Sequence, residues 1–373
     1  MNPRKKIKIV NIVGARPNFM KMAPLYRAYL KNMDLIEPIL VHTKQHSDEK
    51  MSGVFFKTLG LPEPDFSLST DNASPIVMMS QIMTQLDKIL DEVKPDLVLV
   101  VGDVNSTLAA ALTANKKQIK VAHVESGLRS GDKSMPEEVN RILTDNISDF
   151  LFVTEKSGML NLQKEGIDES KIFFTGNVMI DNLINMLPKI QASDIQEKLN
   201  LSGKKYVVMT MHRPVNVDNE KGLNSIIDII ETVAKEDIYV VFPIHPRTSN
   251  SLKKFKDISD KLNRIEKLIV AEPMEYLDFM KLLKDSKFVL TDSGGIQEEA
   301  AYLKIPTITL RKNTERPSTV ECGANHICPP DDEINIDKLI QDILNIKNDN
   351  ISDIPLNDGK ASERIINVLV NNL

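Results

Sequence analysis

The chain has 373 residues, a length that suits two α/β domains better than one small core. It carries 47 Lys and Arg against 52 Asp and Glu, a net charge of −5, which argues against binding duplex nucleic acid because such binding needs a basic face. Two cysteines give no disulfide framework, and no apolar run approaches the ~20 residues of a membrane span. Lys8 and Asn11 interrupt the first apolar run, so it predicts a buried strand rather than a secretion signal. We therefore expect a cytoplasmic protein without a membrane partner.

Short β-rich runs alternate with amphipathic stretches along almost the whole chain, which is typical of parallel βαβ units. The predicted strands fall into two sets, 7–13, 38–42, 96–102, 120–125, 150–154 and 172–175, then 206–211, 239–244, 267–270, 288–291 and 307–310. The sequence thus predicts an α/β fold with two Rossmann-like domains, 1–178 and 179–359, facing a central cleft. The apolar spacing in 360–373 predicts a last helix that packs back on the first domain. Ligands of such folds bind at the carboxyl ends of the strands.

The first predicted strand is followed by a turn that suits an anion. Gly14 permits a tight turn and Pro17 suits the start of a helix, while Arg16 and Lys21 add two cations near the helix N-terminus. The spacing G-x-G-x-x-G is absent, so an NAD-dependent dehydrogenase is not favoured. The alternative for Arg16 is a solvated loop cation.

A second turn of this kind follows a strand in the second half. The residues at 291–295 are Thr-Asp-Ser-Gly-Gly and open a helix, so a diphosphate could approach the backbone N–H groups. Glu299 lies about one turn later, where a carboxylate could accept hydrogen bonds from both ribose hydroxyls. The alternative is a salt-bridged surface glutamate, which we prefer for Glu298. Arg316, beyond the next strand, is a candidate contact for the diphosphate.

Three acidic residues of the first half stand at or beyond strand ends. Asp103 and Glu125 directly follow apolar runs, and Glu137 follows a Gly- and Ser-rich loop. Carboxylates gathered in a partly desolvated crevice can act as acid or base, so three on neighbouring elements indicate an acid/base site. The alternatives are a helix cap for Asp103 and an ion pair with Arg141 for Glu137.

His212 ends the first strand of the second half, where it could donate to a leaving phosphate or shuttle a proton. His123, inside a strand, is instead expected to be a core residue with satisfied ring nitrogens. No His, Cys, Asp and Glu cluster has metal-ligand spacing, so we expect no metal and no other cofactor.

Taken together, these motifs resemble the non-hydrolysing UDP-N-acetylglucosamine 2-epimerase family. The resemblance keeps its order and spacing over nearly the full chain. The matching strings are Gly14-Ala15-Arg16-Pro17 with Lys21, Val101-Gly102-Asp103 with Ser106-Thr107, His123-Val124-Glu125-Ser126-Gly127-Leu128-Arg129, Pro136-Glu137-Glu138-Val139-Asn140-Arg141, Thr175-Gly176-Asn177, His212-Arg213, Asp292-Ser293-Gly294-Gly295-Ile296-Gln297-Glu298-Glu299 and Thr314-Glu315-Arg316-Pro317.

The resemblance implies a glycosyltransferase-B type fold, a homodimer, and the reversible interconversion of UDP-GlcNAc and UDP-ManNAc through 2-acetamidoglucal. It assigns acid/base roles to Asp103, Glu125 and Glu137 and places His212 near the diphosphate. It assigns substrate contacts to Arg16, Lys21, Arg141, Phe279, Ser293, Gly294, Gly295, Glu299 and Arg316. From residues alone, Phe279 would be assigned to the core.

The resemblance also has departures, and it leaves alternatives open. Members activated by a second substrate molecule carry an Arg after the residues that match Gln45 and His46, and this chain lacks it, so these two residues are only possible allosteric contacts. After His212-Arg213, many members carry Arg-Glu-Asn where this chain has Pro-Val-Asn. The alternatives are an epimerase of UDP-2,3-diacetamido-glucuronic acid, a hydrolysing epimerase, a glycosyltransferase of the same fold, and a non-catalytic sensor of nucleotide sugars.

Overall fold

The chain forms two compact units in the computed structural model. Unit 1 contains Met1–Ile184 and Pro355–Leu373, and unit 2 contains Asn185–Ile354. The division falls inside helix α7 (Val178–Gln191), a few residues beyond the boundary expected after residue 178, and the chain returns to unit 1 slightly before residue 360. The structure describes residues 5–44, 56, 58–71, 74–329, 336–346 and 350–373.

Unit 1 is built on a parallel sheet with the strand order β3-β2-β1-β4-β5-β6-β7. Its direction of growth reverses between β1 and β4, which creates the switch point at which doubly wound folds bind ligands. The strands are β1 (Ile7–Val13), β2 (Ile36–His42), β3 (Phe66–Ser67), β4 (Leu97–Val101), β5 (Lys120–Ser126), β6 (Phe150–Val153) and β7 (Ile172–Phe174).

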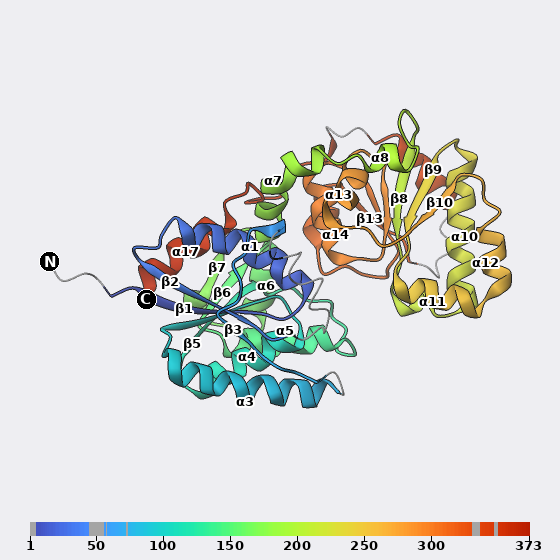
Figure 1. Ribbon diagram of the computed structural model, residues 1–373. Helices are drawn as coiled ribbons and strands as arrows, with labels where there is room; N and C mark the ends of the chain where they lie inside the picture. Colours follow the sequence, from blue (N-terminus) through green and yellow to red (C-terminus); the bar gives the residue numbers. More distant parts are fainter. Residues whose placement is uncertain (1–4, 45–55, 57, 72–73, 330–335, 347–349) are drawn as a thin grey trace. The chain divides into compact units, whose positions relative to one another are not determined.

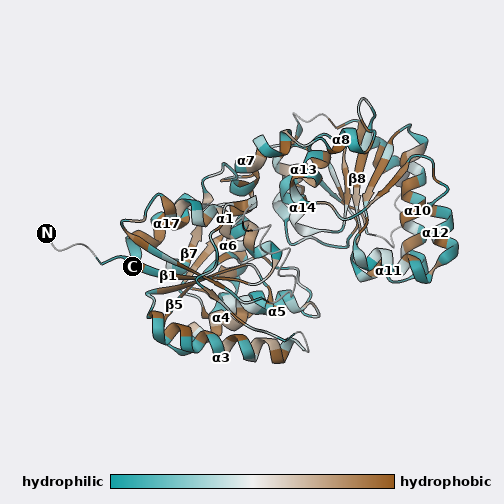
Figure 2. Ribbon diagram, in the orientation of Figure 1, coloured by the Kyte–Doolittle hydropathy of each residue, from teal (hydrophilic) through white to brown (hydrophobic). Residues whose placement is uncertain are grey.

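Helices cover both faces of this sheet. Helices α1 and α17 pack together on one face, and α3, α4 and α5 lie on the other (Figure 1). The strands are apolar while the outward sides of helices such as α3 are polar (Figure 2). Besides α7, the helices of unit 1 are α1 (Arg16–Leu30), α3 (Pro75–Val93), α4 (Asn105–Lys116), α5 (Pro136–Ile147), α6 (Lys156–Lys164) and α17 (Ala361–Asn372), with a 3₁₀ turn at Glu169–Lys171.

Helix α3 shows how the sequence fixes these elements. The Ser74 hydroxyl accepts a hydrogen bond from the Val77 amide at 3.2 Å and so caps the helix N-terminus. Met78, Ile82 and Leu86 recur every four residues and form its buried stripe against the sheet. The helix ends at Lys94, which takes a left-handed conformation with φ of 48°.

Unit 2 repeats this design with a parallel sheet in the order β10-β9-β8-β11-β12-β13, whose switch point lies between β8 and β11. The strands are β8 (Tyr206–Thr210), β9 (Tyr239–Pro243), β10 (Leu268–Ala271), β11 (Val289–Thr291), β12 (Thr307–Thr309) and β13 (Asn325–Ile327). The helices are α8 (Ile195–Lys198), α9 (Pro214–Val217), α10 (Glu220–Lys235), α11 (Pro246–Lys254), α12 (Lys256–Leu262), α13 (Tyr276–Lys284), α14 (Gly294–Tyr302), α15 (Pro317–Glu321) and α16 (Ile336–Leu344).

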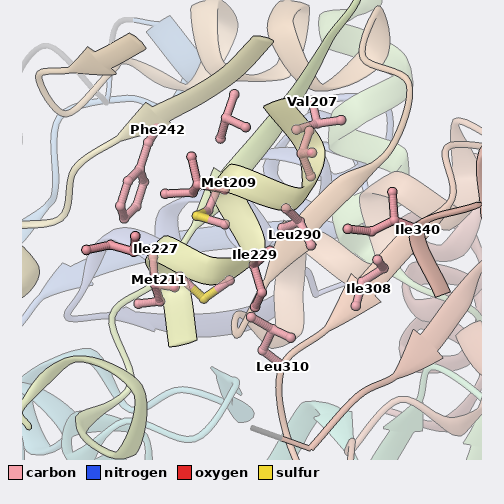
Figure 3. Close-up of a cluster of buried hydrophobic side chains, with 14 of the residues drawn as sticks. Val207, Met209, Met211, Ile227, Ile229, Phe242, Leu290, Ile308, Leu310 and Ile340 are labelled. Carbon is pink, nitrogen blue, oxygen red and sulfur yellow. The ribbon is translucent and has the colours of Figure 1, made fainter. Parts of the chain in front are cut away.

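The core of unit 2 joins β8, β9, β11 and β12 to helices α10, α12 and α16. Alternate residues of β8, such as Val207 and Met209, point into this core, which they share with Ile227 of α10 and Ile340 of α16 (Figure 3). This packing fixes the strand ends that carry the candidate site residues of unit 2.

Candidate active site

The end of β1 is tied to the end of β4 by one buried side chain. The Asn18 amide oxygen accepts from the Gly14 and Ala15 backbone N–H groups at 3.0 Å, and its nitrogen donates to the Val101 carbonyl at 2.9 Å. A Cβ at Gly14 would lie 2.2 Å from the Ser106 hydroxyl, so the turn requires glycine. These contacts fix the switch point of unit 1.

Lys21 and Glu125 form a buried ion pair at this switch point. The Lys21 Nζ lies 2.7 Å from Glu125 Oε2, and both side chains are less than a tenth exposed. A Cβ at Gly102 would lie 2.8 Å from the same Nζ, so this glycine makes room for the ammonium group. The structure therefore joins Lys21, expected to contact substrate, to one of the expected acid/base carboxylates.

Glu125 also has an unusual backbone. Its φ is +70°, in the left-handed region that favours glycine, and the pairing of β5 with β6 shifts register between Val124 and Ser126. Bulges and left-handed non-glycine residues are enriched next to functional sites, where they aim a side chain. The bulge therefore supports a functional role for this carboxylate.

Arg141, buried on α5, holds the second carboxylate. Its Nη2 forms an ion pair with Asp103, and its Nη1 lies 2.9 Å from Glu138 Oε2. Asp103 does not cap the following helix, because the N-cap residue is Val104 and it makes no side-chain capping bond. Glu138 also accepts from the Ser130 and Gly131 amides at 3.0 Å, which fastens the loop before α5.

Two other expected site residues of unit 1 lie outside these pairs. Glu137 is exposed on the first turn of α5, and its side chain makes no hydrogen bond or ion pair with the described residues. The alternative ion pair of Glu137 with Arg141 is therefore wrong, since Arg141 turns to Glu138 and Asp103. Arg16 is exposed as the first residue of α1.

His123 is a buried core residue with both ring nitrogens satisfied, as predicted. Its Nδ1 lies 2.7 Å from Asp145 Oδ1, and its Nε2 lies 2.8 Å from the Gly102 carbonyl oxygen. Burial alone would raise the pKa of Asp145, but His123 and Arg129 together lower it below its usual value. The Asp145 and His123 pair thus supports the strand end that carries Asp103.

In unit 2, the switch point brings His212 to Asp292. The His212 Nδ1 lies 2.8 Å from Asp292 Oδ1, and the Asp292 carboxylate also accepts from the Arg213 amide at 2.8 Å and from the Asn216 side chain at 3.0 Å. Thus Asn216, next to the two positions where this chain departs from many relatives, contributes a polar contact. Burial would raise the pKa of Asp292, but the hydrogen bonds from His212 and Arg213 lower it below its usual value.

The sequence reasoning did not assign a role to Asp292. The signal was available, because Asp292 directly follows the apolar strand β11 in the same way that Asp103 follows β4. The sequence reasoning also missed Tyr276, whose hydroxyl donates to Glu299 at 2.8 Å, because a tyrosine on an amphipathic helix gives no sequence signal of its partner.

Helix α14 begins at Gly294, and Ser293 is its N-cap residue without a side-chain capping bond. A Cβ at Gly295 would meet no described atom within 4 Å, so its backbone is open to a ligand. Glu298 is not a surface residue, because it is buried and its Oε1 lies 3.0 Å from the Nε of the equally buried Arg316. This ion pair joins the start of α15 to α14.

Glu299 is buried and accepts a hydrogen bond from the Tyr276 hydroxyl at 2.8 Å. The pKa of Glu299 is raised to about 7, mainly by burial. The hydrogen bond from Tyr276 lowers this pKa, and the charge of Glu298 raises it further. Phe279, on the same helix as Tyr276, is partly buried against the core cluster of Val208, Val241 and Leu282.

Three further expectations concern the possible allosteric residues, a metal site and membrane helices. Gln45 and His46 lie outside the described residues. Within the described residues, no three His, Cys, Asp or Glu side chains gather in a way that could hold a metal ion. No helix in the described part of the chain is long and apolar enough to cross a membrane.

Two parallel sheets with the candidate site residues at their switch points define a two-domain α/β protein of the glycosyltransferase-B type. Residues 28–370 match the family model described as UDP-N-acetylglucosamine 2-epimerase, and the chain belongs to that family. Membership makes it an epimerase, an enzyme of the isomerase class.

Relatives from archaea and bacteria support this assignment. The chain is 41% identical over 367 residues to the UDP-N-acetylglucosamine 2-epimerase of Methanocaldococcus jannaschii, which covers 97% of this chain and 99% of the relative. A crystal structure of the M. jannaschii enzyme in complex with UDP-GlcNAc and UDP matches with a TM-score of 0.87 at 41% identity, covering 98% of this chain and 100% of that one. The UDP-2,3-diacetamido-2,3-dideoxy-D-glucuronate 2-epimerase of Pseudomonas aeruginosa is 38% identical over 322 residues, 86% of this chain and 87% of the relative.

Proposed function

We propose that this enzyme reversibly interconverts UDP-GlcNAc and UDP-ManNAc by elimination and re-addition of UDP, without hydrolysis and without a cofactor. The M. jannaschii relative carries the name UDP-N-acetylglucosamine 2-epimerase, and its structure holds UDP-GlcNAc and UDP. The observation that carries the mechanism is that Asp103 and Glu125, at the ends of neighbouring strands, are each paired with a buried cation.

The chemistry requires this kind of site because the C2 proton of the substrate is not next to a carbonyl. Removing it alone would leave an unstabilised carbanion. When a base takes the C2 proton while the bond from C1 to the UDP oxygen breaks, the electron pair forms a C1=C2 double bond. The product, 2-acetamidoglucal, then accepts a proton on the other face of C2 while a UDP oxygen forms a new bond to C1. Basic groups are therefore needed on both faces of C2.

Unit 1 supplies these groups in our proposal. Asp103, Glu125 and Glu137 serve as acid/base residues, and their cations keep two of them in fixed positions. An ammonium or guanidinium group within hydrogen-bond distance offsets the cost of placing a carboxylate in a buried or partly buried site, as at Glu125 and Asp103. Contacts of Lys21, Arg141 and Arg16 with the substrate stay predictions.

Unit 2 supplies the nucleotide contacts. The N-terminus of α14 favours a diphosphate, because its first amides and its dipole attract anions, and Gly295 leaves the approach open. Glu299 binds the ribose hydroxyls and Phe279 lies against uracil. Arg316, Ser293, Gly294 and His212 complete the proposed set around the diphosphate.

Product analysis by NMR tests the proposed reaction. Incubation with UDP-GlcNAc should give UDP-ManNAc, and incubation with UDP-ManNAc should give the same final mixture. Accumulation of free N-acetylmannosamine and UDP would show a hydrolysing epimerase instead. A glycosyltransferase would give neither product without an acceptor.

The carboxylate variants Asp103→Asn, Glu125→Gln and Glu137→Gln test the assignment of the acid/base residues. Each should lower kcat by about 100-fold or more with little change in UDP affinity, since acid/base groups contribute on this scale. Glu169→Gln, an exposed substitution on the 3₁₀ turn of unit 1, is the matched control. A variant with the turnover of this control would remove its residue from the mechanism.

A second substrate is favoured by the P. aeruginosa relative, which is named for UDP-2,3-diacetamido-2,3-dideoxy-D-glucuronate. Comparing kcat/KM for this compound and for UDP-GlcNAc decides between them. We expect the higher value for UDP-GlcNAc, and the reverse order would transfer the proposal to the diacetamido substrate.

A further inference from the structure

The buried carboxylate of Asp292 receives donors on both of its oxygens. Oδ1 lies 2.8 Å from His212 Nδ1. Oδ2 accepts from the Arg213 amide at 2.8 Å and from Asn216 Nδ2 at 3.0 Å, and the His212 amide lies 3.0 Å from Oδ2 and 3.2 Å from Oδ1. The same Asn216 nitrogen donates to the Leu310 carbonyl at 3.2 Å, which fixes its orientation as a donor. All these contacts lie within unit 2.

The arrangement leaves one choice for the ring proton of His212. An ionised carboxylate can only accept hydrogen bonds, so the nitrogen that faces it must carry the hydrogen. The hydrogen bonds from His212 and Arg213 hold the pKa of Asp292 below its usual value despite burial. Asp292 is therefore ionised at neutral pH.

We propose that Asp292 is a positioning residue that fixes His212 in the tautomer protonated at Nδ1 and leaves Nε2 as the nitrogen that serves the substrate. The inference deepens the proposed function, in which His212 lies near the diphosphate, and it rests on that function for its catalytic meaning. The side chain of His212 is 36% exposed, so the ring is open to a ligand while Asp292 is fully buried.

With Nδ1 bound to Asp292, Nε2 is the ring nitrogen that can donate to the substrate. Nε2 takes a proton from solvent before the reaction and presents the resulting N–H to the diphosphate, which gains negative charge as its bond to C1 breaks. The imidazolium is stabilised by the Asp292 carboxylate at Nδ1. No bond to the ring forms or breaks during the elimination, and the proton returns to solvent when the product leaves.

The variant Asp292→Asn should reverse the tautomer without changing the shape of the site. The Arg213 backbone N–H and the Asn216 side-chain NH₂ both donate to Oδ2. In the variant, the side-chain oxygen of the new asparagine must therefore take the place of Oδ2. Its NH₂ group then faces His212 Nδ1, which becomes an acceptor, and the ring proton moves to Nε2.

NMR of the full-length chain labelled with ¹⁵N-histidine reads the tautomer directly. The chain has six histidines, and the His212 signals are identified by their loss in His212→Gln. At alkaline pH, where the ring carries one proton, we expect that proton on Nδ1 in the wild type and on Nε2 in Asp292→Asn. A wild-type ring protonated at Nε2, or the same tautomer in both proteins, would overturn the inference. The wild-type spectrum decides alone if Asp292→Asn does not fold.

Kinetics separate a positioning role from a merely structural one. Asp292→Asn should lower kcat by about 100-fold with KM changed less than about threefold, because the amide that then faces Nδ1 cannot stabilise the imidazolium as the carboxylate does. The double variant with His212→Gln should be no slower than His212→Gln alone. Asp237→Asn, which removes an exposed aspartate charge from unit 2, should leave both the tautomer and kcat unchanged. Losses of kcat that multiply in the double variant would show that Asp292 does not act through His212. An inactive wild-type enzyme with the expected tautomer would refute the proposed function but not the pairing of Asp292 with His212.

Discussion

Lys21 and Glu125 show how single residues link stability to the site. Each is buried, and their charged atoms are 2.7 Å apart. Removing one partner of such a pair leaves a buried charge without compensation, which costs far more than losing an exposed pair. The same contact can therefore be tested by stability as well as by activity.

Lys21→Met should lower the free energy of unfolding by about 3–5 kcal/mol, because the buried Glu125 carboxylate loses the ammonium group that lies 2.7 Å from it. The double variant Lys21→Met with Glu125→Gln should recover most of that loss, since the negative charge of Glu125 is then removed as well. Denaturant unfolding followed by circular dichroism measures both. Lys198→Met, which breaks the exposed pair with Asp194, is the control and should not move the midpoint. Equal midpoints for Lys21→Met and the control would contradict the account.

In the proposed function, Glu299 binds the ribose and so makes nucleotide binding depend on pH. Its carboxylate must be ionised to accept from two ribose hydroxyls, and burial raises its pKa to about 7. Below that pH the protonated form prevails, so binding must first release a proton. Affinity should therefore rise with pH up to about 7 and level off above it.

For UDP-GlcNAc, whose diphosphate has no proton to lose near neutral pH, we expect binding about tenfold weaker at about pH 6 than on the plateau. Calorimetry over this range measures the effect. Glu299→Gln should bind more weakly and without the pH dependence. An unchanged slope in that variant would assign the titration to another group.

At the scale of elements, the sequence predicts the long apolar strands well and the short polar ones not at all. The first strand is confirmed at Ile7–Val13. It could be predicted because a largely apolar run of this length is typical of a strand buried on both faces. Strands β3, with two residues, and β13, Asn325–Ile327, were missed. Both lie at sheet edges, and neither contains enough alternation to be recognised.

In the candidate site, the sequence predicts where a residue lies along the chain better than which residue it contacts. Strand ends could be located from the sequence, so Asp103, Glu125 and His212 could be named. The partner of Arg141 could not, because Glu137 and Glu138 are both at helical spacing from it and only packing decides. In the structure Glu138 faces inward and Glu137 faces solvent.

The turn after β5 offers a test of local geometry. Gly127 has a φ of +79°, and a Cβ there would lie 2.5 Å from the Gly158 carbonyl oxygen. Gly127→Ala should therefore destabilise unit 1 by more than the ~1–2 kcal/mol of left-handed strain alone. Gly166→Ala is a matched control, since Gly166 has a φ of +78° and no described atom within 4 Å of a Cβ. Equal unfolding midpoints for the two variants would show that the turn relaxes.

At the scale of the whole molecule, the chain leaves unit 1 through α7 and returns to it at Pro355. The return is fixed by Asp181, whose carboxylate accepts from the Ala361 and Ser362 amides at the start of α17 at 3.1 and 2.7 Å. Helix α17 packs against α1, the helix that carries Lys21. The C-terminal segment thus supports an element of the candidate site.

In the proposed reaction, unit 1 supplies the acid/base residues and unit 2 supplies the nucleotide contacts.

The expected homodimer stays a prediction, and light scattering of the purified chain tests it. A mass of twice the chain mass is the expected result, and a monomer would contradict it.

The central claim is that the bond between C2 and its hydrogen is broken and remade on the enzyme. Incubating the chain with UDP-GlcNAc in D₂O and following the C2 proton by NMR tests this most directly. We expect deuterium at C2 in both UDP-GlcNAc and UDP-ManNAc, with the glycosidic link to UDP intact in the products. Binding of UDP-GlcNAc without any deuterium at C2 would contradict the account and leave a protein that only binds nucleotide sugars.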